Sequence, residues 1–313
     1  MALELDFGRV RSMVGRLGLG RAIAVETLAG GSAPVFRIDL ADGSALVLKS
    51  YDRPEKLPRR EAYAAGLVAP LGLPTTRYLA IDETLADLPF AFALANYLEG
   101  VPVATFRDAP DAGDLYCQMG QLLRRLHGIR LPAFGHFEAG GIASPVIGNA
   151  DYMRKVAGHA FGQFRHYGGK PALAGALEGA VAARAELFGH SRGPVFAHDD
   201  LHPNNVLARR DAEGRLHLSG LLDFGNARSA DAVFDLAKTL FICEHDAPGS
   251  REAILAGYGP VDHPDPAGAL WLYTLLHRVV MWWWLRHVGQ IGEDERHELI
   301  VALEAMADEA RPF

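Results

Sequence analysis

The chain has 313 residues, of which 49% are apolar and 22% are charged, and its formal net charge is −7 at pH 7. This composition is typical of a folded globular protein and excludes a largely disordered chain. The negative charge, without a long basic stretch, also argues against nucleic-acid binding, because phosphate contacts supply most of the affinity there.

Two further features bear on the compartment. Cys117 and Cys243 stand far apart and outside any CxxC pattern, so neither a disulfide framework nor a cysteine zinc site is expected. The stretch 1–10 contains Glu4 and Asp6 and has no apolar core, unlike a signal peptide. No uncharged apolar run approaches the roughly 20 residues needed to span a bilayer. We therefore expect a cytoplasmic protein without membrane or nucleic-acid partners.

The first hundred residues predict a small β-rich lobe with few helices. Apolar spacing separates helices from strands, and the turn at 41–43 predicts a hairpin. In chain order, the expected elements are a helix over 6–19, strands over 22–28, 35–40 and 45–50, a helix over 58–70, and strands over 78–81 and 90–97.

Helices dominate beyond a candidate linker at 96–100, and one strand-rich island interrupts them at 195–223. The expected helices cover 112–127, 150–167, 171–188, 231–243, 250–258, 267–287 and 294–310. The pattern therefore predicts an α+β fold with two lobes, an N-terminal one over 1–97 and a helical C-terminal one over 98–313.

The strand-rich island contains the most specific motif. Asp200 is followed by Asn205 five residues later, and an Asp-Phe-Gly triplet begins at Asp223. This order and spacing are typical of the catalytic and metal loops of the kinase fold. One carboxylate (Asp223) and one amide oxygen (Asn205) are hard ligands of the kind that Mg²⁺ prefers. Asp200 can orient an acceptor hydroxyl and take its proton.

Residues in the N-terminal lobe fit the nucleotide side of the same chemistry. Lys49 ends the third expected strand, and Glu61 follows twelve residues later in a helix, as for a phosphate-binding lysine and its ion-pair partner. Taken alone, the two are more simply an exposed lysine and a solvated glutamate. The small-residue turn with Gly31 and Ser32 could offer backbone N–H groups to a phosphate, although it is not a full GxGxxG loop.

With these motifs the chain resembles the aminoglycoside phosphotransferase and choline kinase family, whose members share the protein-kinase fold. The family's His-Gly-Asp-x-x-x-x-Asn loop stands here as His198-Asp199-Asp200 followed by Asn205. The resemblance implies a bilobal, protein-kinase-like fold and a kinase that uses ATP or GTP with Mg²⁺. It implies Asp200 as the base and Asn205 and Asp223 as metal ligands.

The resemblance also assigns residues that the motifs alone do not. It implies that Lys49 and Glu61 serve the nucleotide and that the backbone near Asn96 and Leu98 holds the adenine. Asp235 matches a family aspartate that braces the catalytic loop.

Two positions in the catalytic loop depart from the family pattern. Asp199 replaces the usual glycine before the base, and Asn204 replaces a common second glycine. If Asp199 points toward Asp200, like charge would raise the pKa of the base. If it points away, nothing follows, and the sequence leaves both orientations open.

Three other interpretations use the same residues. A protein kinase would need an activation segment that ends in Ala-Pro-Glu, which does not occur downstream of Asp223. A zinc or iron site at His198, Asp199, Asp200 and His202 would leave Asn205 and Asp223 without a role. A nucleotide-binding sensor or scaffold without turnover is the third alternative.

The acceptor is expected between Asp200 and the C-terminal helices, over about 240–313. Acidic candidates there for contacting an amine are Glu244, Asp246, Asp262 and Asp265, although each is more simply a solvated loop acid. Most of the tryptophan run 282–284 is expected in the core, and one ring could line the pocket or stack on a cation. The family acts on antibiotics, choline, amino acids, sugars and macrolides, and the sequence does not select among them. Our hypothesis is that the substrate is a small, cationic molecule, either an aminoglycoside or another amine-bearing alcohol. An aminoglycoside substrate would imply a role in antibiotic resistance.

Overall fold

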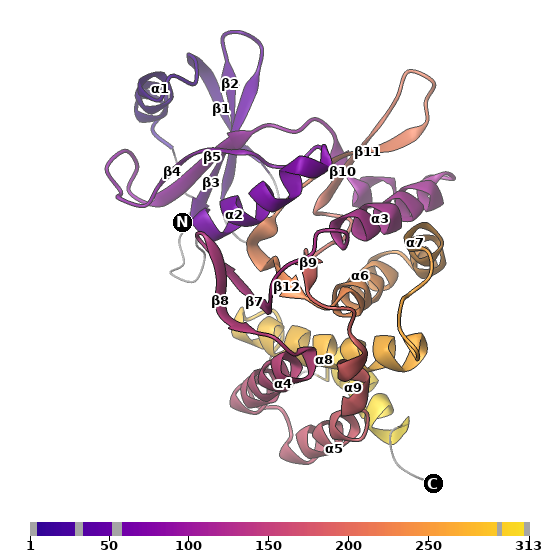
Figure 1. The fold of residues 1–313 in the computed structure, drawn as a ribbon. Coiled ribbons are helices and arrows are strands. Elements are labelled where there is room, and N and C mark those ends of the chain that lie inside the picture. Colours follow the sequence, from indigo (N-terminus) through magenta and orange to yellow (C-terminus); the bar gives the residue numbers. More distant parts are fainter. Residues whose placement is uncertain (1–4, 29–33, 52–57, 293–295, 310–313) are drawn as a thin grey trace. The chain divides into compact units, whose positions relative to one another are not determined.

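The computed structural model describes residues 5–28, 34–51, 58–292 and 296–309. The chain forms two compact units, which are described separately. The first contains Met1–Leu115, Phe137–Gly141 and Pro203–Ala227, and the second contains Tyr116–His136, Ile142–His202 and Arg228–Phe313. The first holds a five-stranded antiparallel sheet and the second most of the helices, which confirms the α+β expectation (Figure 1). The domain boundary at residue 98 remains a prediction.

The sheet of the first unit has the order β1-β2-β3-β5-β4, and every neighbouring pair is antiparallel. The turn between β2 and β3 is closed by the N–H of Gly43, which donates to the Leu40 carbonyl at 3.0 Å. The strands are β1 (Ala22–Leu28), β2 (Val35–Leu40), β3 (Ala45–Tyr51), β4 (Tyr78–Asp82) and β5 (Ala91–Asn96).

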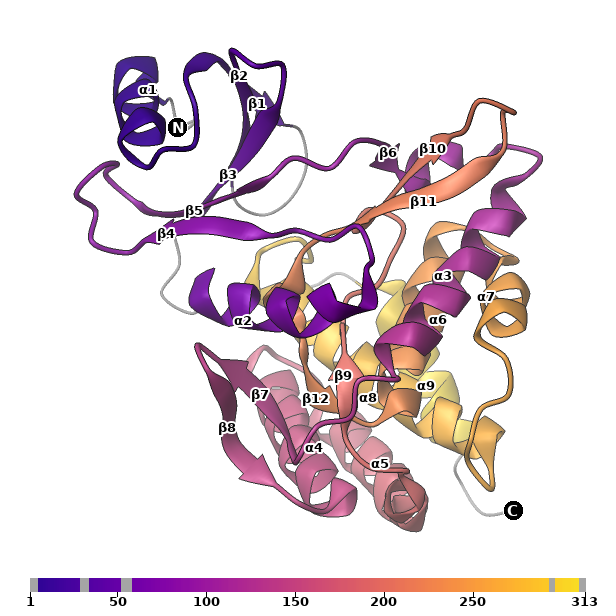
Figure 2. The same ribbon diagram turned by 45° about the horizontal axis from the view of Figure 1, so that its top comes forward.

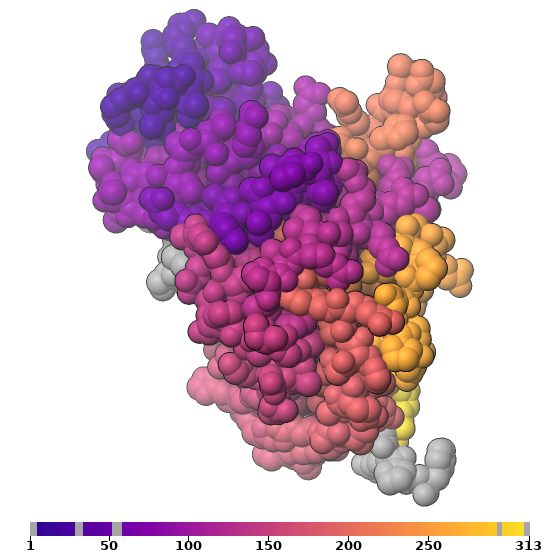
Figure 3. All heavy atoms as spheres, viewed as in Figure 1, coloured from indigo at the N-terminus to yellow at the C-terminus, as the bar shows by residue number. Residues whose placement is uncertain are grey.

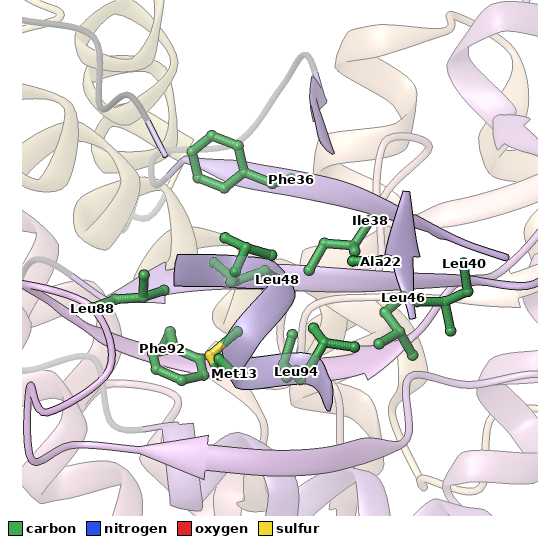
Figure 4. Close-up of a cluster of buried hydrophobic side chains, with 12 residues drawn as sticks. Met13, Ala22, Phe36, Ile38, Leu40, Leu46, Leu48, Leu88, Phe92 and Leu94 are labelled. Atoms are coloured by element: carbon green, nitrogen blue, oxygen red, sulfur yellow. The ribbon is translucent and has the colours of Figure 1, made fainter. Parts of the chain in front are cut away.

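One face of this sheet is covered by α1 (Phe7–Arg16), which begins where Asp6 accepts the N–H groups of Gly8 and Arg9. Alternate residues of the strands point into this core, as period-two patterning requires. Figure 4 shows the cluster, which consists of Val10, Met13, Val14, Ala22, Phe36, Ile38, Leu40, Leu46, Leu48, Leu88, Phe92 and Leu94. Because Leu46 and Leu48 face α1, the side chain of Lys49 belongs to the opposite face of β3.

A helix and a hairpin complete the first unit. The helix α2 (Pro58–Val68) lies beside β4 (Figure 2). Strands β10 (Val206–Arg210) and β11 (Leu216–Leu221) form the hairpin, whose exposed tip is coloured salmon-orange in Figure 3. β10 also pairs with β6 (Val101–Pro102), and a short 3-10 turn, η4 (Phe224–Asn226), follows β11. Two further 3-10 turns are η1 (Ala69–Leu71) and η2 (Val103–Phe106).

Gly100 allows the close approach of β6 to this hairpin. Its φ is +133°, a conformation that side chains rarely adopt, and a Cβ there would come within 2.3 Å of Ser219 Oγ and 2.9 Å of the Ala208 carbonyl oxygen. Glycine is therefore required where the chain passes from β5 toward β6.

The second unit is built on helices around a small sheet of order β8-β7-β12-β9. Helix α8 packs against α6, α4 and α9. The helix α3 (Ala112–Leu126) begins within the first unit and continues into the second. The remaining helices are α4 (Asn149–His166), α5 (Pro171–Ala182), η3 (Ala185–His190), α6 (Ala232–Asp246), α7 (Ser250–Tyr258), α8 (Pro266–His287) and α9 (Glu298–Glu309), and the strands are β7 (Phe134–Glu138), β8 (Gly141–Val146), β9 (Val195–Ala197) and β12 (Arg228–Ala230).

The expected elements agree with this structure in kind and order, and the main differences are the following. The strands β7, β8, β6 and β12 were not expected. The helix predicted over 171–188 is two elements, α5 and η3, because it ends at Ala182. The predicted start of the last helix, 294, lies outside the described residues, and α9 begins at Glu298. None of the described helices is long and apolar enough to cross a membrane.

Candidate active site

The hairpin register brings the two expected metal ligands to the same end of the β10–β11 hairpin. Val206 pairs with Leu221 in the antiparallel ladder, so the residues just outside this pair are neighbours. The N–H of Leu222 donates to the Asn205 carbonyl at 2.9 Å, and Asp223 follows directly. The spacing of about eighteen residues between Asn205 and Asp223 is therefore the length of one hairpin, which returns the chain to its starting point.

Asp223 has a constrained backbone and an accessible side chain. Its φ of 56° lies in the left-handed region, and its Oδ1 accepts the N–H of Gly225 at 3.2 Å at the start of η4. The side chain is 47% exposed. The carboxylate is thus accessible while one of its oxygens accepts a backbone N–H.

Lys49 lies between two carboxylates. Its Nζ is 2.9 Å from Glu61 Oε2, 3.1 Å from Glu61 Oε1 and 3.1 Å from Asp223 Oδ1. Burial alone would lower the pKa of Lys49, but the attraction of Asp223 and Glu61 outweighs it and raises that pKa. The predicted ion pair between Lys49 and Glu61 is thus present, and we name Lys49, Glu61 and Asp223 the Lys49 cluster.

Two tyrosines that the sequence analysis missed hold Glu61 in place. The hydroxyl of Tyr78 donates to Glu61 Oε2 at 2.6 Å, and that of Tyr51 donates to the same oxygen at 3.0 Å. Glu61 is 3% exposed, and burial followed by its negative charge raises the pKa of Tyr78, so this hydroxyl stays protonated and donates. Gly225 leaves room for this carboxylate, since a Cβ there would come within 3.2 Å of Glu61 Oε1.

Asp200 lies in the second unit, on the loop that follows β9. The preceding backbone is fixed by Asp235 of α6, which accepts the N–H groups of His198 and Asp199 at 2.8 Å each. Asp235 also contacts His127 Nε2 at 3.1 Å. Burial alone would raise the pKa of Asp235, but the contact with His127 and the other contacts of this carboxylate outweigh burial, so the pKa of Asp235 is lowered. The expected brace is confirmed, and it leaves the Asp200 side chain 23% exposed.

The structure determines which way Asp199 points. Its side chain is 3% exposed and forms an ion pair with Arg228 at 2.6 Å. Lys238 Nζ lies 3.5 Å from Asp199 Oδ1 and 3.4 Å from Asp200 Oδ1. Burial alone would lower the pKa of Lys238, but Asp199 and Asp200 outweigh it and raise that pKa. The extra carboxylate is therefore neutralised by two cations, and we name Asp199, Asp200, Arg228 and Lys238 the Lys238 cluster.

The oxygen donors of Asn205 and Asp223 fit Mg²⁺, whereas the residues of the rival zinc or iron site are not arranged to hold a metal ion. The exposed carboxylate of Asp223 and the neighbouring Asn205 are oxygen donors, and a nucleotide supplies further oxygens in such sites. Within the described ranges, no three His, Cys, Asp or Glu side chains are grouped so that they could hold a metal ion. His202 Nε2 is 4.0 Å from Asp200 Oδ2, and Asp199 is already engaged by cations. The rival site at 198–202 therefore lacks a supporting geometry.

The segments expected to bind the rest of the nucleotide are described only in part. The N–H of Asn96 donates to the Arg77 carbonyl at 3.2 Å, and its Oδ1 accepts the Arg77 N–H at 2.5 Å, so Asn96 ends β5 in a fixed position. Leu98 follows in the loop before β6 and packs beside Gly220. Gly31 and Ser32 lie outside the described residues.

The acidic candidates for contacting the acceptor are mostly engaged in local structure. Glu244 accepts the N–H groups of Gly249 and Arg251, and Asp265 caps α8. Asp262 pairs with Arg192 at 2.9 Å. Asp246 is the last residue of α6 and is exposed.

The tryptophans divide between the core and the surface. Trp282 is buried against Phe164, with ring centroids 4.6 Å apart, and Trp283 stacks on Tyr167. Trp284 is 39% exposed.

Comparisons with known proteins place this geometry in context. The model of the Phosphotransferase enzyme family matches residues 24–272. A thermostable mutant of aminoglycoside phosphotransferase APH(4)-Ia, in a ternary complex with ADP and hygromycin B, is 16% identical with a TM-score of 0.69, and 96% of each chain is covered. APH(2")-IIIa in a GDP and kanamycin complex is 16% identical with a TM-score of 0.62, covering 97% of this chain and 98% of that one.

Choline kinase LicA from Streptococcus pneumoniae is also 16% identical, with a TM-score of 0.61 and 96% of each chain covered. At this identity the three structures establish a shared fold, which is the expected protein-kinase-like one. No curated protein sequence matches the chain.

Proposed function

The chain belongs to the Phosphotransferase enzyme family, and from this premise we propose that it transfers the γ-phosphoryl group of ATP or GTP to a hydroxyl of a small molecule. The single observation that carries the proposal is the Lys49 cluster at the end of the β10–β11 hairpin. There a buried ion pair supports an exposed carboxylate, Asp223, and the hairpin register holds Asn205 next to it.

We propose that Asn205 and Asp223 are the ligands of Mg²⁺, which when bound neutralises charge on the phosphates of the nucleotide. Lys49 contributes a second positive charge to the phosphates, because its ammonium is already oriented by Glu61 and Asp223. Gly31 and Ser32 are proposed to contact the phosphates, and the backbone at Asn96 and Leu98 the base, as the family resemblance implies.

We propose Asp200 as the base. The acceptor oxygen attacks the γ-phosphorus while the bond from this phosphorus to the β,γ-bridging oxygen breaks, so the nucleoside diphosphate leaves with that oxygen. The hydroxyl proton moves to a carboxylate oxygen of Asp200, which is partly exposed on a braced loop. Precise placement of this carboxylate supports the transfer more than its basicity does.

The acceptor is proposed to be an amine-bearing alcohol, such as an aminoglycoside. Relatives of the same fold are named for complexes with hygromycin B and kanamycin or as a choline kinase. In this chain the exposed Asp246 is the acidic candidate, and the exposed Trp284 is the aromatic candidate. The free thiols of Cys117 and Cys243 are consistent with the cytoplasm, which we propose as the compartment.

A turnover screen tests the proposed function. Purified chain with Mg²⁺ and either ATP or GTP is offered amines, sugars and antibiotics, and mass spectrometry detects a product that has gained one phosphoryl group. Asp200→Asn is expected to lose at least about a thousandfold in kcat while it still binds nucleotide. Asp108→Asn, which changes a 91% exposed aspartate, is the matched control and retains activity.

Two outcomes would contradict the proposal. Magnesium-dependent nucleotide binding without phosphorylation of any acceptor in a broad panel would favour a sensor or scaffold. Substantial turnover of Asp200→Asn with a verified acceptor would remove Asp200 from the role of base.

A further inference from the structure

Lys238 of α6 contacts both residues of the Asp199–Asp200 pair. Its ammonium donates to the main-chain carbonyl of Asp199, and it lies 3.5 Å from Asp199 Oδ1 and 3.4 Å from Asp200 Oδ1. The contact to the carbonyl is a hydrogen bond, and the two carboxylate oxygens lie at ion-pair distance. One lysine thus connects the backbone before Asp200 with the side chain of Asp200.

The backbone that Lys238 contacts is in an unfavourable conformation. Asp199 has a φ of 53°, in the left-handed region that residues other than glycine rarely occupy. Its N–H donates to Asp235 and its carbonyl accepts from Lys238, and both partners are on α6. Residues three apart on a helix lie on the same face, so one side of α6 holds both polar groups of this peptide segment.

The negative charge of the Asp199 side chain compensates the positive charge of Lys238. Arg228 pairs with its Oδ2 at 2.6 Å, and Lys238 approaches its Oδ1. The Lys238 cluster therefore contains two cations and two anions. Without Asp199, Arg228 would lose this ion pair, and Lys238 would keep the carboxylate of Asp200 alone.

We propose that Lys238 is a positioning residue that fixes the orientation of the Asp200 carboxylate, and that Asp199 balances the charge of Lys238 at this place. The inference rests on the proposed function, because that function gives Asp200 the role of base. A lysine anchored by its hydrogen bond to the Asp199 carbonyl and by the charge of Asp199 restricts the rotation of the Asp200 carboxylate. Displacement of a reacting group by about 1 Å can cost about a hundredfold in rate.

The first test measures the position of Asp200 and needs no acceptor. Crystal structures of the wild-type chain, of Lys238→Met and of the double variant Asp199→Asn/Lys238→Met are compared. The double variant removes one positive and one negative charge, so the net charge of the Lys238 cluster is unchanged. It therefore provides the test if Lys238→Met alone does not fold. We expect the Asp200 carboxylate to shift by about 1 Å or more or to occupy two orientations in either variant.

The second test separates positioning from general stability. With an acceptor found by the screen, Lys238→Met is expected to lower kcat about 10- to 100-fold and to leave the KM for nucleotide within about twofold. Lys238→Arg, which keeps a positive charge, is expected to recover part of the loss. Lys155→Met, the same change at an exposed position on α4, is the control and leaves both constants unchanged.

An Asp200 carboxylate that keeps its wild-type position in both variants would overturn the inference, as would a wild-type kcat for Lys238→Met. If the wild-type chain phosphorylates no acceptor, the proposed function fails, and the position of Asp200 in the crystals still decides whether Lys238 orients it.

Discussion

The Lys49 cluster and the Lys238 cluster each place one lysine between two carboxylates, but they balance charge differently. Lys49 stands between Glu61 and Asp223, so this trio has a net charge of −1 and keeps Asp223 47% exposed. In the Lys238 cluster, Arg228 adds a second cation and the charges cancel. Excess exposed negative charge suits a group that receives a metal ion, whereas a balanced buried set suits one that holds a backbone.

The largest difference between the two clusters is expected for Asp223→Ala. Removal of this carboxylate is expected to lower kcat by at least about a thousandfold, because a metal ligand is lost. The unliganded chain should lose only about 1 kcal/mol in its free energy of unfolding, because the bond from the Gly225 N–H is lost while Lys49 retains Glu61.

Calorimetry with Mg²⁺ and AMP-PNP, together with kinetic assays and urea unfolding, characterises Asp223→Ala. Asp39→Ala removes another partly exposed carboxylate from the same unit and serves as the control. Unchanged magnesium-dependent nucleotide affinity in Asp223→Ala would contradict its assignment as a ligand.

Asp199→Gly is expected to behave in the opposite way. Glycine relieves the left-handed backbone strain, but it leaves Arg228 and Lys238 without their shared anion. We expect a net loss of about 2–3 kcal/mol in the free energy of unfolding, measured by urea denaturation.

Adding Lys238→Met to Asp199→Gly should restore part of that loss, because it removes one of the two uncompensated cations. A stabilising effect of Asp199→Gly alone would show that backbone strain outweighs charge balance at this position.

The second unit is also expected to weaken in acid because of His277. The Nε2–H of His277 donates to the Phe234 carbonyl at 2.9 Å. Burial lowers the pKa of His277 to about 4, because it outweighs the attraction of Asp199, and the nearby cations Lys238 and Arg228 act in the same direction as burial. An unfolded histidine titrates near 6.5, so between these values only the unfolded chain binds the proton. The stability that the neutral His277 provides is complete above about pH 7 and is lost as pH falls toward 4. The total loss in the free energy of unfolding is up to about 3 kcal/mol.

Unfolding free energies from pH 7 to 4.5, compared between wild type and His277→Gln, isolate this contribution. The variant should show a shallower decrease, whereas His159→Gln, at an exposed position on α4, should follow the wild type. Parallel curves for wild type and His277→Gln would contradict the neutral, buried state of His277.

The smallest expected effect concerns the tyrosines that hold Glu61. Tyr51→Phe combined with Tyr78→Phe removes two hydroxyl donors while keeping the rings, and we expect nucleotide affinity to fall about 3- to 10-fold. Tyr63→Phe, on the same helix as Glu61, is the matched control.

If the tyrosines act through the carboxylate, the double change should have no further effect in a Glu61→Ala background. Fully additive losses, measured as AMP-PNP affinity, would show that the hydroxyls act by another route.

Local patterns allowed much of the first unit to be predicted. The alternation in 35–51 and the turn at 41–43 specify β2 and β3. The spacing of Asp200, Asn205 and Asp223 is enough by itself to predict the candidate site, and their roles remain predictions. The strands β7 and β8 were missed because Gly135, Gly141 and Pro145 disrupt the alternation, and pairing with the distant β12 stabilises β7 instead.

The supporting residues of the site could not be predicted for a related reason. Tyr78 on β4 meets Glu61 on α2, and Lys238 meets Asp199 across 39 residues, so no sequence spacing connects them. The orientation of Asp199 depended on Arg228 of β12, whose position follows from strand pairing with β9. Residues expected to touch the reacting groups follow a local motif, whereas residues that hold them come from distant segments.

The central claim is that Asn205 and Asp223 bind the divalent ion of a nucleotide whose phosphoryl group is transferred. A crystal structure with Mn²⁺ and AMP-PNP, analysed by anomalous scattering, tests it directly. The account predicts an ion coordinated by Asn205 Oδ1, the Asp223 carboxylate and phosphate oxygens, with Lys49 on the phosphates. A nucleotide-bound ion that neither residue coordinates would contradict it.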